Sequence, residues 1–106
     1  MSANLDFSDT LIQGTVGVEA QCFPGFGSQP RVDIDTVPAA GTVPSAQATV
    51  SGTTRYVAVK TDEKVKVFAG PAGTSSGDKA ALARVVNAPG ESFGVRAGDA
   101  VHVWKY

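Results

Sequence analysis

A chain of 106 residues is long enough for one domain and too short for two. Nine Lys and Arg nearly balance ten Asp and Glu, for a formal net charge of −1, which argues against a nucleic-acid partner. No stretch approaches the roughly 18 consecutive apolar residues of a membrane helix, and the single cysteine excludes an internal disulfide.

The first predicted strands lie in a segment rich in loops. Residues 10–18 form one candidate strand, and residues 31–37 form a second. In the second, Val32 and Ile34 share one face while Asp33 and Asp35 share the other, which predicts one buried and one solvated face. Residues 1–47 are therefore either an arm or a part of the domain.

Strand signals become stronger after a predicted loop over residues 38–45. Residues 48–50 predict a short strand, and residues 54–60 and 65–69 predict two longer ones. Because only the polar turn 61–64 separates the longer strands, we expect them to pair as a hairpin. The lysines Lys60, Lys64 and Lys66 form the only local basic cluster, which we interpret as the solvated end of this hairpin.

The last third of the chain predicts a loop, a helical turn and a second hairpin. Residues 70–77 form the loop, and residues 78–86 predict either a helical turn after Gly77 or a strand throughout, with a strand favoured for the second half at Val85 and Val86. Residues 91–95 and 100–104 predict the arms of the second hairpin, with Gly98 supplying a positive φ in its turn.

Short strands at regular spacing, with Gly and Pro in the turns, predict an all-β fold. We expect one domain over residues 1–106, built as a small β-sandwich or compact barrel of about six to seven antiparallel strands. Residues 48–106 would supply the core hairpins, and residues 1–47 a loop-rich N-terminal extension.

Motifs for catalysis, cofactors and metals are absent from the sequence. Asp78 stands before Lys79 where a phosphate-binding loop needs Gly-Lys, and no Gly-x-Ser-x-Gly elbow occurs. One histidine, His102, makes a zinc site improbable, and Cys22 is interpreted as a structural thiol. We therefore expect no enzyme, no cofactor and no metal. A small barrel enzyme using His102 is a weaker alternative.

Four aromatic residues are candidates for a partner interface. Two lie in a loop-like segment, where they either plug the core or contact a partner, and two crowd the C-terminal end. Trp104 shares a strand face with His102, opposite Val101 and Val103, so it is expected either to pack on a second sheet or to be half exposed or covered by a neighbouring subunit. His102 is expected at a surface or a subunit contact. The four candidates are Phe23, Phe26, Trp104 and Tyr106.

The second half of the chain carries a series of patterns in a fixed order. They are an apolar strand, a Gly-rich Thr/Ser loop, a strand of the form E-x-F-x-V and a strand of the form G-D-x-V-x-V, and they stand at residues 55–59, 65–71, 74–76, 89–95 and 98–103. With these patterns, roughly residues 48–104 resemble small virion proteins of tailed bacteriophages.

The resemblance implies a structural role on a capsid, as a decoration, cement or fibre-base subunit. The implied partner is the major capsid protein or another virion protein, and a homo-oligomer such as a trimer is expected. The N-terminus has no signal-peptide pattern, so we expect assembly in the host cytoplasm into the virion, with no membrane partner. The alternative is a carbohydrate- or ligand-binding sandwich module of an adhesin or fibre, using the same four aromatic residues.

Overall fold

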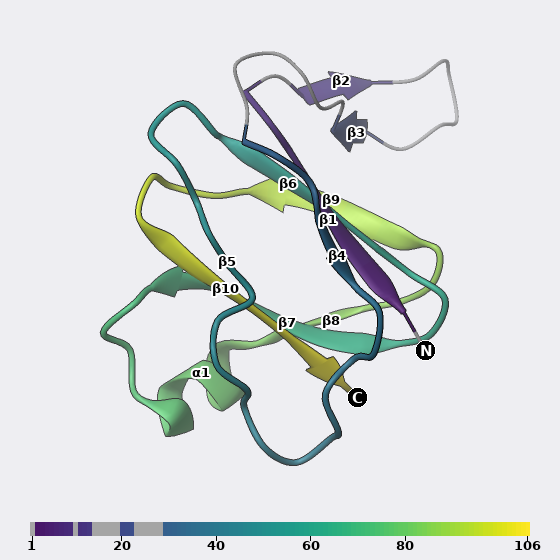
Figure 1. Ribbon diagram of the computed structural model, residues 1–106, viewed down its shortest axis with the longest axis vertical. Helices are drawn as coiled ribbons and strands as arrows, with labels where there is room; N and C mark the ends of the chain where they lie inside the picture. The colour runs from purple at the N-terminus through teal and green to yellow at the C-terminus, as the bar shows by residue number, and fades with distance from the viewer. Residues whose placement is uncertain (1, 10, 14–19, 23–28) are drawn as a thin grey trace.

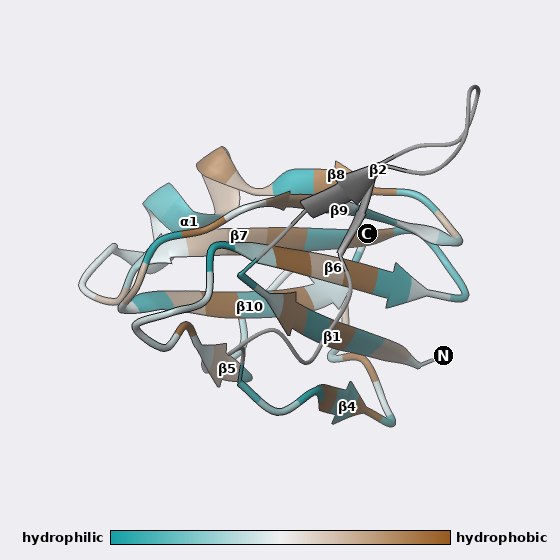
Figure 2. Cartoon of the chain, turned by 90° about the horizontal axis from the view of Figure 1, so that it is seen from above, coloured by the Kyte–Doolittle hydropathy of each residue, from teal (hydrophilic) through white to brown (hydrophobic). Residues whose placement is uncertain are grey.

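The computed structural model describes residues 2–9, 11–13, 20–22 and 29–106, and these residues form two antiparallel four-stranded sheets packed face to face (Figures 1 and 2). The first sheet has the order β4 (Val32–Ile34), β1 (Ala3–Ser8), β6 (Tyr56–Thr61) and β9 (Gly90–Gly94). The second has the order β5 (Ala48–Thr49), β10 (Asp99–Lys105), β7 (Val65–Pro71) and β8 (Arg84–Val86). A separate pair is formed by β2 (Leu11–Gln13) and β3 (Ala20–Cys22). The predicted all-β sandwich is confirmed.

The core lies between the two sheets and follows from the alternation of apolar residues. Leu5 and Phe7 of β1 point inward from the first sheet, and Val101 and Val103 of β10 point inward from the second. These four side chains are completely buried, and β-branched residues dominate the rest of the core. The burial of both inner faces supplies the apolar area that stabilises so small a domain.

Both predicted hairpins are wrong in their pairing. The strands β6 and β7 follow one another in the chain, but β6 pairs with β1 and β9 while β7 pairs with β10 and β8. In the same way β9 lies in the first sheet and β10 in the second. Each connection therefore crosses from one sheet to the other. A short polar turn permits either outcome, and crossing lets Val57 and Val59 of β6 pack on the same core as Val65 and Val67 of β7.

The N-terminal segment contributes two strands to the sandwich. The strand β1, which no sequence pattern predicted, lies between β4 and β6 in the middle of the first sheet. Of the strand predicted at residues 10–18, only residues 11–13 lie in a described strand, β2, and residues 14–18 are outside the described part of the chain. The second predicted strand is present as β4, where Ile34 is buried and Asp33 is exposed.

The helix α1 (Ser76–Leu82) is followed by the strand β8, so of the two alternatives for residues 78–86 the structure has the helical turn, with the strand favoured at Val85 and Val86 after it. Ser75 is the N-cap, and its hydroxyl accepts a hydrogen bond from the Asp78 N–H at 3.2 Å. Ala83 is extended and ends the helix, after which β8 begins at Arg84. The turn before β10 contains Gly98 at φ 87°, as its position in the sequence predicted.

Candidate functional site

The structure places the four predicted interface residues in three different situations. Phe23 and Phe26 lie outside the described residues. Trp104 is only 3% exposed, whereas Tyr106 is 58% exposed. Trp104 is therefore not available to a partner in this fold, and Tyr106 is the only one of the four that the structure describes at the surface.

Trp104 and His102 are buried although they lie on the outer face of β10, so a surface position for His102 is wrong. Residues 38–47 run beside β10, where the Pro38 carbonyl accepts the Lys105 N–H at 2.9 Å. His102 Nδ1 lies 2.8 Å from the Pro44 carbonyl oxygen. Both residues are thus covered within one chain, and no neighbouring subunit is needed to bury Trp104.

The contact of His102 determines the tautomer of its ring. A carbonyl oxygen only accepts hydrogen bonds, so Nδ1 carries the proton. Nε2 is buried and has no hydrogen-bond partner among the described residues. Phe68 packs at a ring-centroid distance of 6.0 Å. His102 is only 3% exposed, so its ring is enclosed by the protein in this structure.

Tyr106 lies under two ammonium groups from the region where β7 begins. Lys64 Nζ is 4.1 Å from the centroid of the Tyr106 ring, and Lys66 Nζ is 5.4 Å from it. Both distances are within the range of a cation–π interaction. Lys66 pairs with Val85 of β8 and with Trp104 of β10, so its side chain belongs to the outer face of the second sheet.

Three large hydrophobic side chains are exposed in the described ranges: Leu82 at 70%, Val85 at 38% and Tyr106 at 58%. Val85 of β8 lies across the β7–β8 ladder from Lys66, whose ammonium group is near the Tyr106 ring. Leu82 is the last residue of α1. We call the surface formed by Val85 and Tyr106 with Lys64 and Lys66 the Tyr106 face.

Sequence reasoning missed most of the Tyr106 face. Lys64 and Lys66 were interpreted as the solvated end of a hairpin that does not exist. The alternation of Lys66 with buried Val65 and Val67 does place the lysine on an outer face. Nothing in the sequence brings Val85 beside it, because that contact depends on the pairing of β7 with β8.

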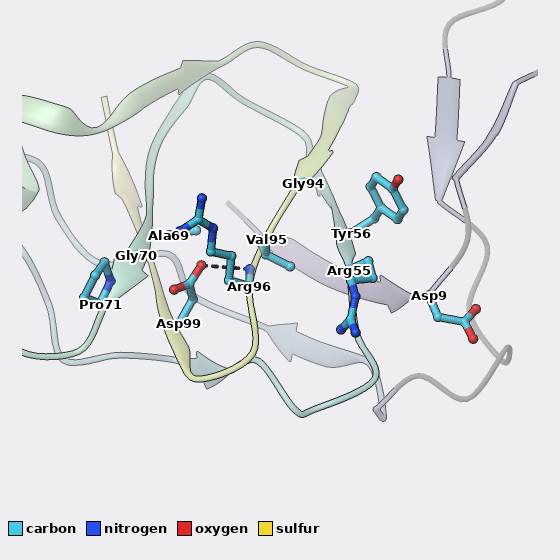
Figure 3. A pocket seen from close by; sticks show the side chains of 10 residues that line it. All are labelled: Asp9, Arg55, Tyr56, Ala69, Gly70, Pro71, Gly94, Val95, Arg96 and Asp99. Carbon is cyan, nitrogen blue, oxygen red and sulfur yellow. Dashed lines mark hydrogen bonds between the residues drawn. The ribbon is translucent and has the colours of Figure 1, made fainter.

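A depression at one end of the sandwich combines four charged residues. Figure 3 shows Arg96 and Asp99 on one side of it, with Tyr56 and Asp9 on the other and Arg55 between them. Its lining contains no histidine, cysteine or serine, so the described residues there offer no nucleophile paired with an imidazole base.

Two of these charged groups serve the local loops. Arg55 Nη1 donates to the carbonyl oxygens of Gly52 at 2.9 Å and Thr54 at 3.2 Å. Asp99 Oδ2 accepts the backbone N–H of Arg96 at 2.9 Å and so holds the turn before β10. These contacts stabilise the loop conformations, and we assign no binding role to the depression.

Carboxylates within the described ranges do not converge on a metal site. No group of three or more His, Cys, Asp or Glu residues lies close enough there to hold an ion. Asp33 is exposed and accepts a hydrogen bond from Arg31 Nε at 2.9 Å. Arg31 Nε and Lys60 Nζ also lie 3.6 and 2.9 Å from the buried carboxylate of Asp6, which therefore has two cationic partners.

No protein-family model, no curated protein sequence and no solved structure matches the chain. Within the residues that the structure describes, no helix is both long and apolar enough to cross a membrane.

Proposed function

We propose that this chain is a structural virion protein that binds the outside of a phage capsid as a decoration, cement or fibre-base subunit. The observation that carries the proposal is the resemblance of residues 48–104 to small proteins of tailed-phage virions. The described fold is compatible with that role, because a small sandwich with two buried inner faces is a stable unit to add to a shell.

The exposed side chains that the structure describes favour binding to the surface of another protein over binding to a small molecule. The Tyr106 face presents an exposed tyrosine ring beside an ammonium group, and tyrosine is enriched at protein interfaces. The carbohydrate alternative relied on an aromatic platform, and the burial of Trp104 removes one of its four members. The major capsid protein or another virion protein is therefore the partner we propose.

The test uses heads of the phage that encodes the chain, prepared from a mutant that lacks it. Purified protein is mixed with these heads and with heads that already carry the chain, and each mixture is sedimented. We expect saturable binding to the deficient heads alone, and imaging of these heads should reveal added density on the outside. Absence of binding to deficient heads, together with binding to a glycan array, would refute the proposal in favour of the carbohydrate-binding module.

Light scattering on a size-exclusion column tests the expected homo-oligomer separately. A mass three times that of the 10.8 kDa chain agrees with a trimer. A monomer that still saturates deficient heads would contradict the trimer and leave the capsid role in place.

A further inference from the structure

We propose that Arg84 and Glu91 form a guard that keeps the free edge of β9 from pairing with β9 of a second copy of this chain. The strand β9 ends the first sheet and β8 ends the second, and Figure 2 shows both at the same side of the sandwich. Arg84 belongs to β8 and Glu91 to β9, so the guard joins the two sheets at that side. It acts whether or not the chain binds a capsid.

The strand β9 offers the longest edge of the two four-stranded sheets. The other edge strands, β4, β5 and β8, have only two or three residues each, whereas β9 has five. An edge strand presents unpaired backbone N–H and C=O groups to any strand that approaches it. Glu91 is the only charged residue of β9, so the strand itself carries little that would repel an incoming strand.

The backbone of Ser92 faces this free edge. The Thr61 N–H donates to the Pro89 carbonyl oxygen at 3.0 Å, so the backbone groups of residue 89 face β6. Because backbone groups alternate between the two edges of a strand, those of Glu91 and Phe93 also face β6, and those of Ser92 face away from it. Two copies of β9 can therefore align antiparallel about a two-fold axis at Ser92, each donating and accepting the same hydrogen bonds.

The guard lies on the inner side of that edge. Glu91 shares a face of β9 with Phe93, which belongs to the core between the sheets. Arg84 Cζ lies 3.9 Å from the centroid of the Phe93 ring, and Arg84 Nη1 lies 3.5 Å from Glu91 Oε1. The side chains of Arg84 and Glu91 are 49% and 41% exposed. A strand added to β9 would remove water from both charges, which costs free energy, and charges that point inward at a sheet edge oppose pairing in this way.

Loss of the guard would reverse this balance. Phe93 is only 9% exposed, with the guanidinium group of Arg84 over its ring. If alanine replaces Arg84 and Glu91, no charge is left to desolvate at this side, and the ring loses the group that lies over it. An incoming β9 would then bury apolar surface of Phe93 and gain the backbone hydrogen bonds of Ser92.

The test compares a guard variant, Arg84→Ala with Glu91→Ala, with a control variant, Asp78→Ala with Lys79→Ala. Each variant loses one cation and one anion, but Asp78 and Lys79 lie on the helix α1 and not at a strand edge. Light scattering on a size-exclusion column measures the mass as the protein concentration is raised. We expect the guard variant to reach about twice the wild-type mass, as two-fold pairing requires. Wild type and the control variant should keep one common mass, and urea unfolding checks that each variant is folded.

Amide hydrogen exchange shows where the copies meet. The Ser92 N–H faces away from β6, so it should exchange rapidly in wild type and more slowly in the associated guard variant. Adding Ser92→Pro to the guard variant removes this donor, and proline is tolerated where the N–H of an edge strand faces outward. The mass should then return to the wild-type value.

Four outcomes would overturn the proposal. A guard variant with the wild-type mass at every concentration shows that the two charges guard nothing. Association without slower exchange at Ser92 places the contact elsewhere on the molecule. Equal association of the control variant assigns the effect to a general loss of surface charge. Slow exchange at Ser92 in an associated wild type shows that the edge pairs with the guard in place.

Discussion

The side chain of Gln47 forms hydrogen bonds with the C-terminal half of β10. Replacing Gln47 by alanine therefore tests how residues 38–47 are attached to that strand. Its side-chain Nε2 donates to the Val103 carbonyl oxygen at 2.7 Å, and its Oε1 accepts the Val103 N–H at 3.0 Å. The strand β5 pairs only with Ala100 and Val101 of β10. The side-chain amide of Gln47 therefore supplies the hydrogen bonds to Val103 that a longer β5 would supply through its backbone. Gln47→Ala would leave both backbone groups of a buried residue without their partner.

The cost follows from the two lost hydrogen bonds. An unsatisfied buried donor or acceptor costs about 1–3 kcal/mol, and Gln47 is half-buried, so we expect a loss of about 2–4 kcal/mol. That is a large share of the roughly 5–15 kcal/mol by which domains are stable. Since the free energy of unfolding of a small protein falls by about 2 kcal/mol per M of urea, the midpoint of urea unfolding should fall by about 1–2 M.

The fluorescence of Trp104, the only tryptophan, reports unfolding in this assay. Ser45→Ala is the matched control in the same segment, since Ser45 is exposed, and should change stability by less than about 0.5 kcal/mol. Gln47→Glu keeps the acceptor for the Val103 N–H but sets a carboxylate oxygen against the Val103 carbonyl oxygen. Because this repulsion adds to the loss of one hydrogen bond, the destabilisation should be close to that of the alanine variant. If Gln47→Ala and Ser45→Ala unfold at the same urea concentration, the two hydrogen bonds do not hold the segment and the reasoning is refuted.

Three further predictions follow from burial and close contacts. Asp6→Asn should destabilise the fold by about 1 kcal/mol, and the difference from wild type should shrink in 1 M salt, because its two cationic partners are half exposed; a salt-independent difference would contradict this. Gly90→Ala should cost more than about 3 kcal/mol in urea unfolding, because Gly90 has φ 138° and its added Cβ would collide with the backbone of β6. Gly73→Ala, where nothing lies within 4 Å, should be nearly neutral by comparison, and equal effects would contradict the packing argument. Native Trp104 should emit at short wavelength and resist acrylamide quenching, since it is buried; strong quenching would contradict this burial.

Local residue patterns determined much of the secondary structure. The alternation of Val57 with its neighbours predicted β6, and the β-branched pair Val85 and Val86 predicted β8 after a helical turn. Gly98 predicted its turn because a tight turn needs a residue with positive φ. These features depend on neighbours in the chain, so the sequence alone contains the information for them.

Tertiary structure decided which strands pair and which aromatic residues are exposed. A four-residue polar turn is compatible with a hairpin or with a crossing between sheets, and only the joint burial of both inner faces selects the crossing at β6–β7. Trp104 and Tyr106 are two residues apart and share a strand face by periodicity, yet one is buried and the other exposed. Trp104 lies within β10, beside the distant segment 38–47 that bonds to His102 and to Lys105, whereas Tyr106 follows the last residue of the strand. Such contacts depend on the geometry of the whole fold, so a local pattern does not reveal them.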